Sequence, residues 1–164
     1  YPLRQGMPLQ DFRGQLALKS GAFGAVLQSF TAEEAVATDD ATVRLPRHQP
    51  VLTPAQRSQA SDYLGLLAKD RFSPSTERPV DIELLLFLVE RGDVVRINDD
   101  VVYAAHAYNE MESKILDSGS DGREITITSV RDLFGTSRKY TLAVLEHMDS
   151  KGLTRRVNDN RFVR

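Results

Sequence analysis

The chain has 164 residues, a net charge of −2 at pH 7 and 41% hydrophobic residues, a composition typical of a soluble globular protein. It contains no cysteine, which excludes disulfides and thiolate metal sites. No apolar run approaches the roughly 20 residues that a membrane-spanning helix needs, so we expect no membrane insertion. The sequence begins at Tyr1 without an initiator methionine, and we expect a fragment or a processed product.

The first part of the chain is predicted to form two short helices followed by a β-hairpin. The helices are expected around Leu9–Leu18 and Gly21–Glu34, and the second carries apolar residues at helical spacing, namely Phe23, Val26, Leu27 and Phe30. The hairpin is expected over Val36–Leu45, where alternating residues flank a turn at Asp39-Asp40. The prolines at 46 and 50 then disfavour helix in the residues before them, which predicts an extended linker.

The middle of the chain repeats this order of helices and hairpin. The start of its first helix is clearly marked. Thr53 is the expected N-cap, Pro54 takes the first helical position and Gln56 completes a capping box. Asp81 is expected to cap the next helix, Ile82–Arg91, which Gly92 ends. The hairpin is expected over Val94–Tyr103, with a turn at residues 98–100.

The last part contains a predicted helix-turn-helix. A leading helix is expected over about Ala104–Leu116, and a short second helix begins after an N-cap at Thr126 and ends at Gly135. The third helix is expected to run to about Lys151, with its start capped by Thr136 and Ser137. The predicted buried stripe of this helix consists of Leu142, Leu145 and Met148.

The hairpin after the third helix is basic. It is expected over Leu153–Val163, and it and the final residue carry Arg155, Arg156, Arg161 and Arg164. From Arg131 to the end there are eight Lys and Arg against four Asp and Glu, although the whole chain is slightly acidic. The positive charge is therefore local, as in a nucleic-acid-binding face.

The three hairpin turns are centred on Asp39, Asp99 and Asp159, so they recur every 60 residues. Helix, turn, helix and hairpin together predict a mainly helical α+β fold of tandem winged-helix units. The expected boundaries are an incomplete unit over 1–46, a linker over 47–52, a spacer unit over 53–104 and a nucleic-acid-binding unit over 105–164. The first unit would need about 20 residues before Tyr1 to match the repeat, so we expect it to lack its leading helix. Loss of that helix would expose an apolar face, so we expect the unit either to be held by its neighbour or to be partly disordered.

Roughly the last 40 residues also resemble a known family. The segments that carry the resemblance are Phe134-Gly135-Thr136-Ser137-Arg138-Lys139-Tyr140, Leu145-Glu146-His147-Met148-Asp149, Gly152-Leu153-Thr154-Arg155-Arg156 and Asp159-Asn160-Arg161. They are similar to the C-terminal winged helix of SelB, the bacterial selenocysteine-specific translation elongation factor. The resemblance implies a cytoplasmic protein that binds the selenocysteine insertion (SECIS) mRNA hairpin, which recodes UGA. By the same resemblance, the GTPase activity and the contacts with the ribosome and selenocysteinyl-tRNA belong to an N-terminal part that this sequence does not contain.

The candidate RNA contacts gather at the start of the third helix of the last unit. Backbone amides at residues 136–139, with two cations beside them, suit a phosphate or a base edge. A-form RNA has a deep and narrow major groove, so we expect contacts with an exposed loop and a flipped base. The expected RNA-binding residues are Thr136, Ser137, Arg138, Lys139, Arg131, Arg155, Arg156 and Arg161.

Each candidate also has a purely structural interpretation. Arg138 and Lys139 could form an ordinary solvated helix start, and Arg131 is as apt to pair with Asp132 as to contact RNA. Tyr140 suits core packing better than base stacking at its helical position. The last hairpin is the wing of the winged helix, and its arginines, with the one that follows it, also have a competing interpretation. Internal packing or simple surface charge could account for Arg155, Arg156, Arg161 and Arg164.

Other function classes are less well supported. The histidines His48, His106 and His147 lack metal-ligand spacing, and no phosphate-binding glycine loop or nucleophile motif occurs, so we expect no enzyme activity, cofactor or metal. A DNA-binding transcriptional regulator usually needs dimer symmetry, and no dimerisation helix is evident, so we expect a monomer. A protein-interaction scaffold suits the acidic first two units but leaves the basic end unexplained.

Overall fold

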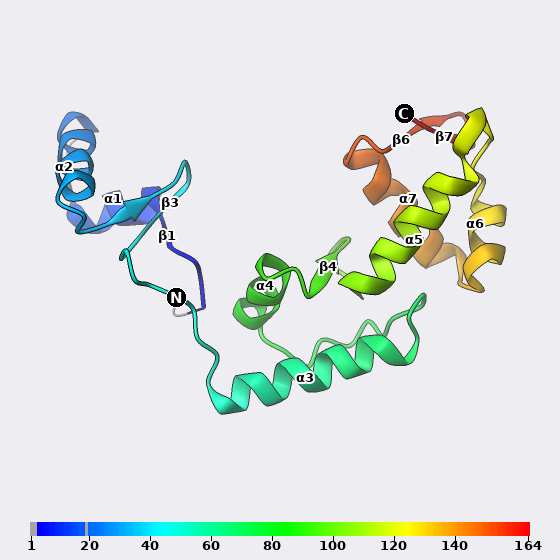
Figure 1. Cartoon of the computed structure of the whole chain (residues 1–164), viewed down its shortest axis with the longest axis horizontal. Coiled ribbons are helices and arrows are strands. Elements are labelled where there is room, and N and C mark those ends of the chain that lie inside the picture. The colour runs from blue at the N-terminus through cyan, green and yellow to red at the C-terminus, as the bar shows by residue number, and fades with distance from the viewer. Residues whose placement is uncertain (1–2, 19) are drawn as a thin grey trace. The chain divides into compact units, whose positions relative to one another are not determined.

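The computed structural model describes residues 3–18 and 20–164 (Figure 1). They belong to two compact units, Tyr1–Ala55 and Gln56–Arg164. Within the described residues, no helix combines the length and the apolar character needed to cross a membrane.

The first unit pairs two helices with a small antiparallel sheet. Its elements are β1 (Met7–Pro8), α1 (Leu9–Leu16), α2 (Ser20–Ala32), β2 (Ala37–Thr38) and β3 (Thr42–Arg44), with β3 central in the order β1-β3-β2. The Asp39 carboxylate fixes the β2–β3 turn by accepting hydrogen bonds from the amides of Ala41 and Thr42 at 2.9 and 2.7 Å. These bonds also lower the pKa of Asp39. Strand β1 was not predicted, and both helices are shorter than predicted.

The hydrophobic core of the first unit is small. Helix α1 contains no buried residue. The apolar residues of α2 are only half-buried, namely Phe23, Val26, Leu27 and Phe30. The buried hydrophobic residues described between 3 and 55 are Leu3, Val43 and Leu52.

The middle segment begins the second compact unit. It contains α3 (Pro54–Lys69), α4 (Ile82–Glu90), β4 (Val94–Arg96) and β5 (Val102–Ala104), with β4 and β5 antiparallel. Asp81 caps α4 as predicted, since its carboxylate accepts the Leu84 amide at 2.8 Å. The predicted hairpin turn is held by Asn98, whose side-chain oxygen accepts the amides of Asp100 and Val101, both at 2.9 Å.

The last segment contains the predicted helix-turn-helix and hairpin. Its elements are α5 (Ala105–Ser118), a 3₁₀ turn (Ser120–Gly122), α6 (Ile127–Phe134), α7 (Arg138–Ser150), β6 (Thr154–Val157) and β7 (Asn160–Val163). Ile125 adds a bridge to Arg161 at the edge of the β6–β7 hairpin, with reciprocal backbone hydrogen bonds of 2.8 and 2.9 Å. This bridge attaches the hairpin to the start of α6.

One hydrophobic cluster joins the middle and last segments. It includes Val101 and Tyr103 from the middle hairpin, and it continues through α5, α6 and α7 to Met148. Strand β5 runs directly into α5, because Ala104 ends one element and Ala105 begins the next. Residues 56–164 therefore form a single body with a shared core. The architecture confirms the predicted α+β class.

Candidate nucleic-acid interface

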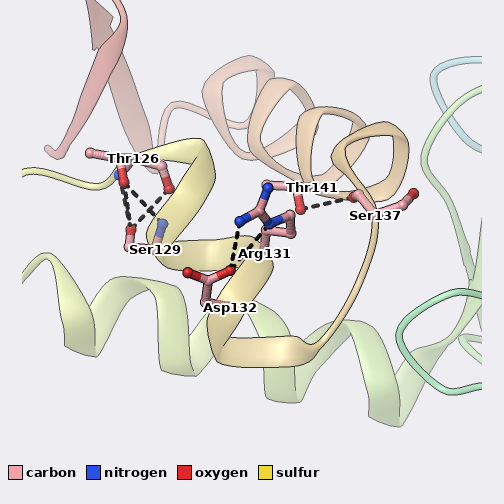
Figure 2. Close-up of polar contacts among 6 residues, drawn as sticks. All are labelled: Thr126, Ser129, Arg131, Asp132, Ser137 and Thr141. Carbon is pink, nitrogen blue, oxygen red and sulfur yellow. Dashed lines mark hydrogen bonds and ion pairs between the residues drawn. The ribbon is translucent and has the colours of Figure 1, made fainter.

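Helix α6 is fixed at both ends by its own sequence. Thr126 and Ser129 form a capping box, in which the Thr126 hydroxyl accepts the Ser129 amide at 3.0 Å and the Ser129 hydroxyl accepts the Thr126 amide at 3.1 Å (Figure 2). Gly135 ends the helix in the left-handed conformation, with φ of 60°, which favours glycine. Val130 and Phe134 bury one face of α6. The turn that leads into α7 is therefore well defined.

Three consecutive exposed residues, Ser137, Arg138 and Lys139, occupy the start of α7. Ser137 is at the N-cap position, but its hydroxyl makes no capping hydrogen bond. Its carbonyl instead accepts the Thr141 hydroxyl at 3.1 Å, while the Ser137 side chain points away from this contact (Figure 2). The first amides of an α-helix have no partner inside the helix, so this end of α7 offers donors and positive charge together.

Thr136, which was predicted to contact RNA, has its side chain buried against the loop that contains Phe72. Thr136 is only 7% exposed. Its hydroxyl donates to the Phe72 carbonyl at 2.7 Å, and its amide donates to the Arg131 carbonyl at 3.1 Å. Thr136 therefore presents neither a free hydroxyl nor a free amide, and it does not cap α7. Sequence reasoning missed this because Phe72 is far away in the chain.

Arg131 lies on the exposed side of α6 beside Asp132. Its Nε and Nη2 atoms donate to one Asp132 carboxylate oxygen at 3.1 and 3.0 Å (Figure 2). Both side chains are about half exposed, so the ion pair is weak and can open for another anion. The neighbouring carboxylate still makes Arg131 a poorer anion site than an unpaired arginine.

The wing arginines differ from one another. Arg155 is exposed, and its side chain forms no ion pair or hydrogen bond with a described residue. Arg156 is exposed but bonds to its own turn, with Nε donating to the Asn158 carbonyl at 2.8 Å and Nη2 lying 3.8 Å from Asp159. Arg155 and Arg156 were predicted to lie on opposite sides of the strand. Of the two, Arg155 is the cation without a bonded partner among the described residues.

Arg161, which was also predicted to contact RNA, is buried in the structure. Its side chain is 2% exposed, and Nε donates to an Asp149 carboxylate oxygen at 2.7 Å. The other oxygen of Asp149 accepts the Thr154 hydroxyl at 2.6 Å. A buried guanidinium that is paired in this way fastens the hairpin to α7 and presents no surface to a ligand.

A polar pocket of about 350 Å³ lies beside Arg138. The first turn of α6 and the wing turn complete its wall, through Thr126, Ile127, Thr128, Asp159 and Asn160. The Asn160 amide nitrogen donates to Glu124 at 2.8 Å, which holds this wall in place. The pocket combines guanidinium and hydroxyl donors with a carboxylate acceptor, a set that suits a nucleobase better than a bare phosphate.

Sequence reasoning missed Thr128, Asp159 and Asn160 as pocket residues. These residues come together only in the folded structure, because the Ile125–Arg161 bridge brings the wing turn to the start of α6. The described residues contain no cluster of three or more acidic or histidine side chains that could hold a metal ion.

Known proteins share the winged-helix segments of this chain. Two models of the SelB elongation factor winged helix match the chain, the second winged helix over residues 1–45 and the third over residues 120–163. Together they span more than half of the chain. The chain belongs to the SelB family. The resemblance inferred from the last 40 residues is thus confirmed, and it extends to the first unit.

A curated relative is the selenocysteine-specific elongation factor of Desulfomicrobium baculatum. It is 27% identical over 82 residues, a match that covers 50% of this chain and 13% of the relative. The chain therefore spans only a small part of that SelB protein.

Two solved structures share the fold. The mRNA-binding domain of Escherichia coli SelB, solved in complex with SECIS RNA, matches with a TM-score of 0.51 at 22% identity, over 69% of this chain and 99% of that one. A bacterial selenocysteine-specific elongation factor, EF-Sec, matches with a TM-score of 0.55 at 16% identity, over 97% of this chain and 26% of that one. At these identities the likeness concerns the winged-helix fold.

Proposed function

We propose that this SelB-family chain binds the SECIS hairpin of an mRNA through its last winged helix, and thereby tethers an elongation factor at a UGA codon that is recoded as selenocysteine. The family supports this proposal, since the curated relative is named as a selenocysteine-specific factor and the E. coli domain was solved with SECIS RNA. The ribosome and selenocysteinyl-tRNA are proposed partners of the rest of such a factor.

The observation that carries the proposal is the free start of α7. Ser137, Arg138 and Lys139 are exposed, and neither cation forms an ion pair with a described residue. In the same winged helix, most other cations are engaged by carboxylates, namely Lys114, Arg123, Arg131, Lys151, Arg156 and Arg161. An RNA ligand therefore displaces no carboxylate partner among the described residues at the start of α7.

The pocket beside Arg138 supplies a place for an unpaired base. Arg138 can donate to base acceptors there, while Asp159 can accept from base donors. Lys139 and the backbone amides of the first turn then neutralise the flanking phosphates. Arg155, and more weakly Arg131 and Arg156, are proposed to contact phosphates of the stem.

The test is binding of this chain to a SECIS hairpin from its own source, a loop-scrambled hairpin and a duplex DNA, each at two salt concentrations. Arg138→Ala is expected to lower affinity for the SECIS hairpin by about 5- to 150-fold if Arg138 contacts a base, which corresponds to roughly 1–3 kcal/mol. Lys139→Ala is expected to lower the salt slope by about 1 if Lys139 neutralises a phosphate. Arg57→Ala, an exposed charge change on α3, is the matched control.

Equal and weak binding to all three nucleic acids would contradict the proposal and favour a protein-interaction scaffold. Preference for the duplex DNA would favour a transcriptional regulator. If Arg138→Ala still bound RNA in a loop-dependent way, the SECIS hairpin would remain the ligand, but the binding site would lie elsewhere than the start of α7.

A further inference from the structure

The loop after α3, residues 70–76, packs against the turn between α6 and α7. The Phe72 ring lies against the Phe134 ring with centroids 4.9 Å apart. Pro74 is buried, and Arg71 forms an ion pair with Glu110 of α5. Residues 70–76 belong to the segment predicted as a spacer, yet they contact the turn that precedes the proposed RNA site.

Three hydroxyl groups link this turn and the start of α7 to the loop. The Thr136 hydroxyl donates to the Phe72 carbonyl at 2.7 Å, and the Ser73 hydroxyl lies 2.8 Å from the same Thr136 oxygen. Since the single Thr136 proton is used on Phe72, Ser73 is the donor in the second bond. The Tyr140 hydroxyl donates to the Pro74 carbonyl at 2.8 Å.

The two fastened residues bracket the proposed RNA contacts. Thr136 immediately precedes Ser137, and Tyr140 immediately follows Lys139. The first turn of α7 lacks a side-chain cap of its own, because the Ser137 hydroxyl makes no capping bond. An uncapped helix end frays easily. The bonds to residues 72–74 therefore hold the first turn of α7, which has no side-chain cap of its own.

We propose that Thr136 and Tyr140 are positioning residues that lock the RNA-binding turn onto the loop at residues 70–76. The proposal rests on the proposed function and changes the role of the middle segment. That segment is a support for the RNA site rather than a passive spacer. A turn that is ordered before binding loses little conformational freedom when RNA binds. The protein therefore binds the RNA with higher affinity than it would with a disordered turn.

The test uses the full chain and variants that remove single hydroxyl groups. Tyr140→Phe and Thr136→Val are each expected to weaken SECIS-hairpin binding by about three- to tenfold, the worth of one hydrogen bond, without changing the salt slope. Thr136→Ser retains the hydroxyl and is expected to keep the affinity. Tyr63→Phe is the matched control, since the Tyr63 hydroxyl is buried and has no hydrogen-bond partner among the described residues.

Backbone order parameters from ¹⁵N relaxation test the same proposal without RNA. Residues 137–139 are expected to show values near 0.85 in the parent chain and in Thr136→Ser, and clearly lower values in Tyr140→Phe and Thr136→Val. Unchanged order parameters would overturn the proposal, as would loss of affinity in Thr136→Ser equal to that in Thr136→Val. If the parent chain fails to bind the hairpin, the proposed function fails while the order parameters still decide the positioning role.

Discussion

Arg161 lies inside the last winged helix, where one Asp149 carboxylate binds both its guanidinium and the Thr154 hydroxyl. Arg155, six residues earlier on the neighbouring strand, is exposed and forms no ion pair with a described residue. The same residue type thus serves stability in one position and is available to a ligand in the other. Burial and the presence of a carboxylate partner decide between the two roles.

Substitution of these arginines should separate stability from binding. Arg161→Leu is expected to lower the free energy of unfolding by about 3 kcal/mol, because it leaves the Asp149 charge without its cation. Arg155→Leu is expected to change stability by less than about 0.5 kcal/mol and to weaken hairpin binding. Urea unfolding curves and hairpin titrations measure the two effects. Equal losses of stability in both variants would contradict the structural role assigned to Arg161.

Helices α5 and α7 meet through a cluster of ionisable side chains. The His147 ring packs edge-on against the Tyr108 ring at 5.4 Å, and the Lys151 ammonium lies 5.2 Å from the same tyrosine ring. Lys151 also donates to Glu112 at 2.6 Å. Burial lowers the pKa of His147, and the charge of Lys151 lowers it further against the opposing effect of Glu112. Neutral histidine is therefore favoured in this interface.

This lowered pKa predicts a loss of stability in mild acid. The unfolded chain binds a proton at His147 near pH 6.5 and the folded chain only at lower pH, so the free energy of unfolding should fall as the pH decreases from about 6.5 towards the folded pKa. His147→Gln is expected to flatten this pH dependence. Unfolding curves at closely spaced pH values give the measurement, and an unchanged slope in His147→Gln would exclude His147 as its source. The pKa of Glu112 is also lowered, but from 4.5, so Glu112 acts in a more acidic range.

At the scale of the whole molecule, the two compact units differ in how much apolar surface they bury. Unit Gln56–Arg164 has a continuous core from the middle hairpin to α7. In unit Tyr1–Ala55, the apolar face of α2 is only half-buried and α1 buries nothing. Few buried contacts mean a low free energy of local opening.

Hydrogen exchange of the full chain should reflect this difference. Amides of α1 and α2 are expected to exchange orders of magnitude faster than those of α5 and α7, whose buried residues include Met111, Ile115, Val144 and Leu145. The middle hairpin is expected to behave like α5, because Tyr103 is part of the same core. Uniform protection along the chain would show that the first unit is as stable as the second.

The sequence by itself determined the local structure of this protein. Helix ends followed from short-range chemistry, as at Asp81, Thr126 and Gly135, because a cap needs only neighbours within a few residues. The 60-residue recurrence of the hairpin turns and the dense motifs near the C-terminus were sufficient for the winged-helix fold and the SelB family. The predicted stripe of α7 was right for Leu145 and Met148, whereas Leu142 is only half-buried.

Only the tertiary structure decided which candidate residues are available to RNA. Strand alternation places Arg155 and Arg156 on opposite faces but does not tell which arginine meets a carboxylate from another element. Asp149 is 12 residues from Arg161, and Phe72 is 64 residues from Thr136. The pocket beside Arg138 likewise joins the starts of two helices with the wing turn. Contacts of this kind depend on how elements pack together, and the local pattern of residue types does not encode them.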